Sequence, residues 1–105
     1  MRELDSRPAI DVVRDFLSFT VADAVSLDEI RADLRQTAQQ TTRALRRELA
    51  ALEAVLADPP TPPGMLMRMV ALEGNWVLDD LTDAGAVRFL GELAQMLRDV
   101  IEEAG

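Results

Sequence analysis

The spacing of apolar residues constrains the fold of this chain more than any other feature of its sequence. They recur three and four positions apart in every long segment, which is the period of an amphipathic α-helix, and no stretch keeps the strict alternation of a half-buried β-strand. Aromatic residues, which favour strands, make up only 4% of the chain. We therefore predict an all-α fold, a three- to four-helix bundle formed by one domain over residues 1–105, with one long central helix and a short irregular segment before the last helix.

The first helix is predicted from about Arg7 to Phe19. Ser6 precedes it as a candidate cap, and Pro8 suits the first turn because the N–H that proline lacks would be unpaired there anyway. The apolar stripe of this helix is broad enough to be buried on more than one side. It comprises Ile10, Val12, Val13, Phe16, Leu17 and Phe19.

The long central helix is predicted to run from residue 27 to about Ala57, a length of roughly 45 Å at 1.5 Å per residue. Ser26 and Glu29 match a capping box at its start. The middle of its seam, residues 36–42, is small and polar and contains two adjacent threonines with poor helix propensity. The sequence leaves three alternatives for this stretch: a kink, a close crossing with another helix, or an overhang into solvent.

A proline-rich corner at residues 58–64 separates this helix from a third, short helix that Thr61 can cap. The third helix is interrupted around Gly74, and its apolar residues include Leu66, Met69, Val70 and Leu72. Its three methionines alternate along the sequence: Met65, Met67 and Met69. They cannot all face one core, so we expect at least one of them to be exposed or covered by a partner.

The last helix, from about Leu81 to Glu103, has the most regular seam in the chain, and Asp80 is its expected cap. We expect ion pairs on its outer face, from Arg88 and Arg98 to the glutamates four residues further on. Gly91 lies beside the seam, where it would let a neighbouring helix approach closely.

Four reactive side-chain types are missing, because the chain has no Cys, His, Tyr or Lys and its 11 basic residues are all Arg. Thiol and Schiff-base nucleophiles, Ser-His-Asp triads, Walker-A lysines and zinc-finger or haem-histidine sites are thereby excluded. An enzyme built on this chain would need carboxylates paired with one another or with a metal. The E-x-x-E motif by which small all-α pyrophosphohydrolases bind Mg²⁺ does not occur. We therefore predict no catalytic, cofactor-binding or metal-binding residues.

The chain is acidic, with 19 acids against 11 bases and a formal net charge of −8. This charge argues against binding nucleic acid, whose phosphates require a basic footprint. Residues 31–47 are an exception, with five Arg and one Asp for a net +4, whereas residues 71–105 hold eight acids and two Arg for a net −6. Either the charged faces are solvated and pair within the molecule, or the acids of the N-terminal helix and of residues 73–83 form a docking surface for a basic partner.

Trp76, the only Trp, lies among acids in the sequence EGNWVLDD. It either anchors the core beneath the irregular segment or forms a partly exposed aromatic hot spot at a protein–protein interface. The acids around it also suit helix capping, since a helix N-terminus favours negative charge. The candidate partner-binding residues of this region are Glu73, Asn75, Trp76, Asp79, Asp80 and Asp83.

The N-terminal residues predict no export signal. The first eight are largely charged and lack an apolar core, and the longest apolar runs of the chain are far short of the roughly 20 residues that a membrane span needs. The absence of Cys fits a reducing compartment. We expect a cytoplasmic protein that does not associate with membranes.

Three segments carry a family resemblance. They are a long leucine helix, LRRELAALEAVL at residues 45–56; an acidic turn, LDDLTDAG at residues 78–85; and the closing helix, FLGELAQMLR at residues 89–98. Together they make residues 42–103 similar to the helical immunity proteins of contact-dependent growth inhibition and related polymorphic-toxin systems. The resemblance implies a bacterial cytoplasmic protein that binds one cognate toxin domain, often a nuclease, and blocks its active site without catalysis.

The sequence therefore favours a non-enzymatic protein-binding module, an immunity- or antitoxin-type neutraliser of a cognate basic toxin, with no cofactor. The alternative is a helical structural or adaptor protein that self-associates, for example as a homodimer, through the seam of residues 27–56. That seam exceeds what a bundle of 105 residues easily covers.

Overall fold

The computed structural model describes residues 8–59 and 62–104, and these residues are helical with no strand. The all-α prediction is confirmed. The described residues form five α-helices, α1 (Ala9–Phe16), α2 (Leu27–Gln40), α3 (Arg43–Ala57), α4 (Met65–Arg68) and α5 (Asp83–Ala104). Two π-helical segments continue the short helices: η1 (Leu17–Val21) follows α1, and η2 (Met69–Glu73) follows α4. The structure thus has more helices than the three or four that we predicted.

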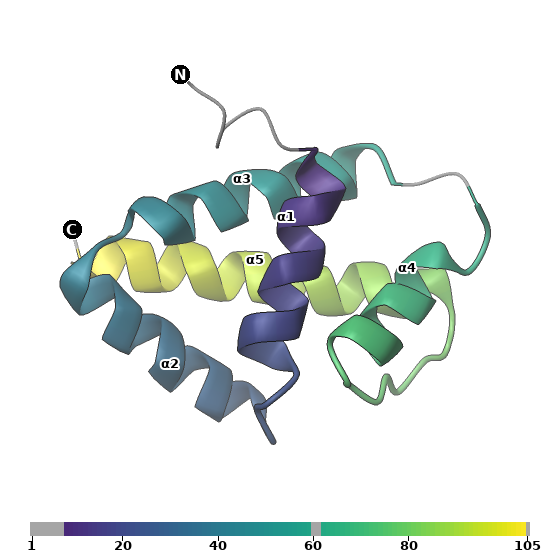
Figure 1. Ribbon diagram of the computed structural model, residues 1–105, viewed down its shortest axis with the longest axis horizontal. Helices are drawn as coiled ribbons and strands as arrows, with labels where there is room; N and C mark the ends of the chain where they lie inside the picture. Colours follow the sequence, from purple (N-terminus) through teal and green to yellow (C-terminus); the bar gives the residue numbers. More distant parts are fainter. Residues whose placement is uncertain (1–7, 60–61, 105) are drawn as a thin grey trace.

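The central helix of the fold is α5, the longest of the five at 22 residues. It runs across the molecule below α3 and behind α1 in Figure 1, and it packs against α2, α3 and α4. Helix α1 crosses steeply in front and packs mainly on α3 (Figure 1). The fully buried side chains come from six of the seven segments, and no polar or charged residue among the described ones is fully buried.

The long helix predicted over residues 27–57 is divided between α2 and α3, within the polar stretch where the sequence left a kink as one of three alternatives. Thr41 has an extended backbone (φ −163°, ψ 144°), and its Oγ1 accepts a hydrogen bond of 3.1 Å from the Arg43 N–H. Both halves bury their seams on α5, with Leu34 on one side of the break and Leu52 on the other. A straight helix of roughly 45 Å would exceed the longest extent of the molecule, 37 Å. The break lets both seams reach the same partner.

Local signals at the start of α2 are confirmed. The Glu29 N–H donates to Ser26 Oγ at 3.2 Å, and the Glu29 carboxylate accepts from the Val25 N–H at 3.4 Å. These are the two bonds of a capping box, with the return bond reaching one residue before the cap. The predicted first-helix cap and start, residues 6 and 7, and the predicted cap at residue 61 lie outside the described residues.

The start of the last helix differs from the prediction. Helix α5 begins at Asp83, and its cap is Thr82, whose Oγ1 accepts from the Gly85 N–H at 3.2 Å. Asp80 instead accepts a hydrogen bond from the Thr82 hydroxyl at 2.9 Å. A threonine two residues later therefore takes the capping role.

Tertiary contacts also replace the expected ion pairs along α5. Arg88 pairs with Asp80 at 2.8 Å and Arg98 with Glu53 at 2.9 Å, rather than with the glutamates four residues further on. These pairs connect α5 to the loop before it and to α3. An ion pair between residues four apart on a helix stabilises the fold by only a few tenths of a kcal/mol, about as little as other exposed ion pairs. The positions of nearby carboxylates therefore determine which partner each arginine takes.

The close approach expected at Gly91 occurs at other glycines. A Cβ on Gly91 would meet nothing within 4 Å, whereas a Cβ on Gly85 would overlap the backbone carbonyl of Asp80. A Cβ on Gly74 would lie 2.7 Å from the Val70 carbonyl oxygen and 3.3 Å from the Leu17 side chain. Gly74 therefore lets η2 pack against η1.

No helix in residues 8–59 and 62–104 combines the length and the apolar character that crossing a membrane requires.

Candidate functional site

The predicted aromatic anchor, Trp76, lies in the irregular segment between η2 and α5. Its ring stacks on Phe89 of α5, with ring centroids 5.0 Å apart and planes inclined by 24°. Its backbone N–H donates to the Val70 carbonyl at 3.4 Å. The side chain is partly buried and packs against the core. Of the two roles weighed from the sequence, this placement matches a core anchor, because a stacked aromatic pair closes the core at this end of α5.

Asp83 connects two helices. Its carboxylate accepts a 2.7 Å bond from the Gly64 N–H and a 3.0 Å bond from the Met67 N–H, so it caps the start of α4 from the first turn of α5. These backbone donors, first Met67 and then Gly64, hold the pKa of Asp83 below its usual value. Gly64 itself adopts a left-handed conformation (φ +81°). The sequence placed this acid at a helix start but gave no sign that it also reaches α4.

The other acids of the predicted set divide into paired and exposed ones. Asp80 accepts from Thr82 and Arg88, which lower its pKa in that order, and Glu73 pairs with Arg14 of α1 at 3.6 Å. Asp79 is exposed and makes no ion pair with another described residue, and Asn75 is exposed in a left-handed conformation (φ +48°). Three of the four predicted acids are thus engaged in contacts within the molecule, with different elements, and Asp79 is the exposed acid that remains.

The sequence analysis missed a set of exposed apolar side chains. Five large hydrophobic residues among the described ones are strongly exposed: Phe19 (78%), Val25 (83%), Leu72 (75%), Val77 (87%) and Leu81 (65%). The sequence places Phe19 in the buried stripe of the first helix, and that prediction is wrong; Leu72 was named only as an apolar residue of the third helix. Both lie in π-helical segments. A π turn contains more residues than an α turn, so successive residues are rotated through a smaller angle about the helix axis. A prediction that assumes the α period therefore assigns a side chain in a π turn to the wrong face of the helix.

These five residues lie in two segments that contain acidic residues and no basic residue. Residues 17–29 contain three acids and no base, and residues 69–83 contain four acids and no base. Both segments lie along the lower side of the molecule in Figure 1, where η1 and η2 contact each other. We call these two segments the acidic edge. An exposed apolar set surrounded by charge of one sign is typical of an interaction surface.

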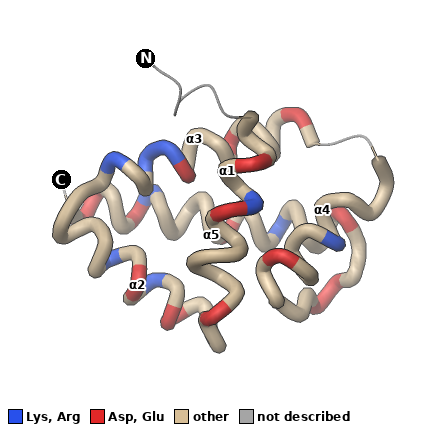
Figure 2. The backbone as a smooth tube through the Cα atoms, in the orientation of Figure 1, with Lys and Arg blue, Asp and Glu red and all other residues tan. Residues whose placement is uncertain are grey.

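Arg14 and Arg88 pair with Glu73 and Asp80 of the acidic edge, whereas the arginines of residues 31–47 lie elsewhere. Figure 2 shows arginines on α2 and α3, on the far side of the molecule from η2, and this placement matches the net +4 of residues 31–47. Arg35 of α2 pairs with Glu103 of α5 at 3.0 Å, so part of the basic segment is compensated from the C-terminal helix. Pairing within the molecule, one of the two interpretations of the charge, therefore occurs between α2 and α5.

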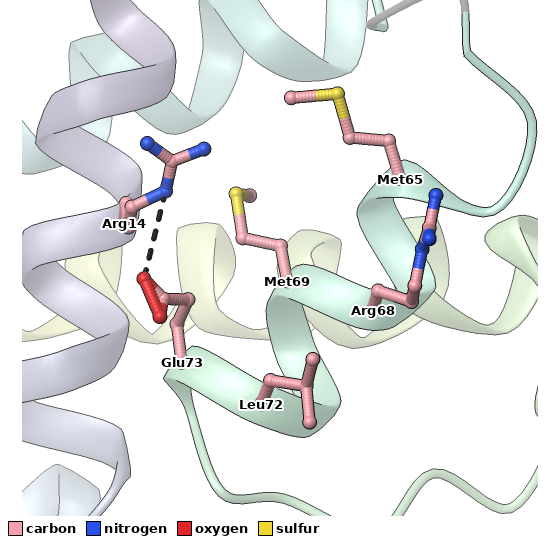
Figure 3. A pocket seen from close by; sticks show the side chains of 6 residues that line it. All are labelled: Arg14, Met65, Arg68, Met69, Leu72 and Glu73. Atoms are coloured by element: carbon pink, nitrogen blue, oxygen red, sulfur yellow. Dashed lines mark ion pairs between the residues drawn. The ribbon is translucent and has the colours of Figure 1, made fainter.

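A groove of about 370 Å³ lies where α1 faces α4 and η2 (Figure 3). Met65, Met69 and Leu72 supply its apolar lining, and the remaining lining residues are Arg14, Arg68 and Glu73. Figure 3 shows the Arg14 guanidinium directed at the Glu73 carboxylate across one end of it. Leu72 belongs both to this groove and to the exposed apolar set, so the groove opens onto the acidic edge.

The predicted exposure of the methionines is met only in part: Met65 and Met67 are half-buried, and Met69 is buried. Within residues 8–59 and 62–104, no three carboxylates lie close enough together to hold a metal ion. The side chains assembled at the acidic edge are thus apolar contacts and carboxylates, a combination suited to recognising a positively charged surface. No protein-family model, curated protein or solved structure matches this chain.

Proposed function

We propose that this chain is a non-enzymatic binding protein that neutralises a basic protein partner, as the resemblance to immunity proteins of polymorphic-toxin systems implies. The observation that carries the proposal is the composition of the acidic edge. Within the described part of the chain, all five strongly exposed large hydrophobic side chains belong to two segments that hold seven acids and no base. Apolar area supplies affinity at such a surface, and charge of one sign selects the partner and accelerates encounter.

The predicted site is refined accordingly. Asp79 and the exposed apolar residues are available to a partner, whereas Trp76, Asp80 and Asp83 are engaged inside the molecule. When the basic active-site surface of the partner binds the acidic edge, that active site is covered. The partner is then blocked without any chemical step.

Self-association through residues 27–56 has less support than the sequence suggested. The seam of those residues is divided at Thr41, and its members Ile30, Leu34, Leu45 and Leu52 are already buried within the molecule. Little of it is left for a second copy to cover. We therefore keep the binding of a basic partner as the proposed function.

The test is co-expression with the product of the gene directly upstream, since an immunity protein is expected beside its toxin gene. We expect the two proteins to co-purify and the host to survive expression of the upstream product only when this chain is present. Because protection should not require a reaction catalysed by this chain, we expect both proteins in the purified complex to be covalently unmodified. Failure to co-purify, together with no protection, would contradict the proposal.

A further inference from the structure

We infer that the acidic edge takes a basic amphipathic helix of the partner, with one apolar side chain of that helix seated in the groove between α1 and η2. This inference rests on the proposed protein-binding function and specifies the element that the surface recognises. It is carried by the shape of the groove, by the exposed apolar residues beside it and by the charge around both.

The groove shares Leu72 with the exposed apolar set. Leu72 is 75% exposed and lines the groove together with Met65 and Met69. Phe19 lies in η1, which packs against η2 through Gly74, so the segments that present Phe19 and Leu72 are neighbours. Methionine side chains are flexible and polarizable, and a groove lined by them adapts to the apolar side chain that enters it.

The charges inside the groove are compensated by the chain itself. Arg14 lies 3.6 Å from both Asp11 and Glu73, and Arg68 is close enough to Asp83 to favour its ionised form. The two arginines therefore do not make the groove basic. Asp23, Asp28 and Asp79 of the acidic edge are exposed and make no ion pair with another described residue, so their charge is available to a partner.

A helix fits this surface better than an extended peptide. Residues 8–59 and 62–104 contain no strand, so they offer no sheet edge to which a peptide strand could add. The groove instead has helical walls, α1 on one side and α4 with η2 on the other (Figure 3). A helix with apolar residues on one face and Lys or Arg on its flanks would place apolar contacts on the groove and cations beside the exposed acids.

Synthetic peptides test the inference on the full chain. The probe is a peptide of about 18 residues, five turns, built from Leu and Lys at helical spacing. One comparison peptide has the same composition in scrambled order, and another has Glu in place of Lys. Titration calorimetry should show saturable one-to-one binding of the first peptide only, weaker at high salt. Absence of binding, or equal binding of the scrambled peptide, would overturn the inference.

Variants locate the contact. Leu72→Ser combined with Val77→Ser should weaken peptide binding about tenfold, since two exposed apolar side chains lose their buried area. The matched control is Ala32→Ser combined with Ala54→Ser, at exposed positions of α2 and α3. Circular dichroism melting checks that each variant is folded. Equal weakening by both pairs, or by neither, would overturn the inference.

The charged contribution is measured separately. Asp23→Asn combined with Asp79→Asn should weaken binding at low salt more than at high salt. Asp58→Asn combined with Glu92→Gln makes the same change in net charge away from the acidic edge and should have less effect. If the two pairs weaken binding equally, net charge alone attracts the peptide and the proposed site is wrong.

Three further outcomes separate this inference from its alternatives. The inference would be overturned if the chain formed a stable dimer and Leu72→Ser combined with Val77→Ser dissociated it. A second copy would then cover the surface. If the upstream gene product binds and is neutralised, and those substitutions change neither its binding nor its neutralisation, the proposed function stands and the helix site fails. If the basic peptide binds at this site but the upstream product is not neutralised, the site stands and the proposed function fails.

Discussion

Glu48 is a residue whose ionisation opposes the fold. It lies half-buried on α3, and burial raises its pKa to about 7. Arg47 lowers the pKa and Asp33 of α2 raises it, and both effects are smaller than that of burial. Loss of water around a carboxylate penalises its charged form, which explains the direction of the shift.

Stability should therefore fall as pH rises between the ordinary pKa of Glu48, 4.5, and its folded value of about 7. In this window the folded state holds more protons than the unfolded state. We expect Glu48→Gln to raise the free energy of unfolding by about 1–2 kcal/mol at about pH 8, after allowance for partial exposure, and to have little effect at about pH 4. Urea unfolding measures both, with Glu92→Gln on exposed α5 as control. An effect that does not depend on pH would contradict this account.

Two glycines of α5 should respond oppositely to the same substitution. Gly85→Ala places a methyl group into the Asp80 carbonyl and should cost about 1–3 kcal/mol or displace the loop before α5. Gly91→Ala meets open space and should stabilise the helix by about 0.5–1 kcal/mol. Thermal and urea unfolding of the two variants provide the comparison. Equal stability of both variants would mean that the loop does not approach α5 as described.

Asp83 should reveal its structural role through pH. Its pKa is lowered because two backbone N–H groups donate to its carboxylate, so its contribution is present above the ordinary pKa and is lost as pH falls through the folded value. We expect Asp83→Asn to lower the melting temperature at neutral pH and the difference from wild type to shrink in acid. Asp79→Asn, at an exposed neighbour, is the control. The same loss at both positions would point to net charge instead of the cap.

At the level of secondary-structure elements, the Thr41 side chain contributes a hydrogen bond to the joint between α2 and α3. Thr41→Ala removes the acceptor of the Arg43 N–H and should lower the free energy of unfolding by about 1 kcal/mol. Gln39→Ala, in the last turn of α2, leaves the joint intact and serves as control. Increased helix content in the Thr41 variant with no loss of stability would show that the fold tolerates a continuous helix there.

The elements also show what could be predicted from the sequence. Signals that act within a few residues were sufficient: the capping box at Ser26, the end of α3 at the prolines, the stop at Gly74 and the seam of α5. The division at Thr41 was left as one of several alternatives, because the polar stretch 36–42 is compatible with a kink or an overhang until the position of α5 is known.

The candidate site was predicted less completely, for a similar reason. The sequence identified the acids and Trp76 by type and spacing, but their partners Phe89, Arg88 and Gly64 come from α5 and α4 and are set by packing. The exposure of Phe19 and Leu72 depends on π turns, which an assumed α period does not represent.

At the scale of the whole molecule, the distribution of charge and apolar surface predicts a monomer in the absence of a partner. The seam of residues 27–56 is covered within the chain, and copies that each carry a net charge of −8 repel one another. We expect sedimentation equilibrium to give a mass near 11.6 kDa at low and at moderate salt. A mass of twice that value would favour the self-associating alternative.

The stacking of Trp76 on Phe89 has a practical consequence. The chain holds one indole and no phenol, so its ultraviolet emission comes from a single place, within the acidic edge itself. Displacement of that ring from Phe89 would change the colour and intensity of the emission without any attached dye. Capture of another protein at this end of the molecule can thus be followed in the unlabelled native chain.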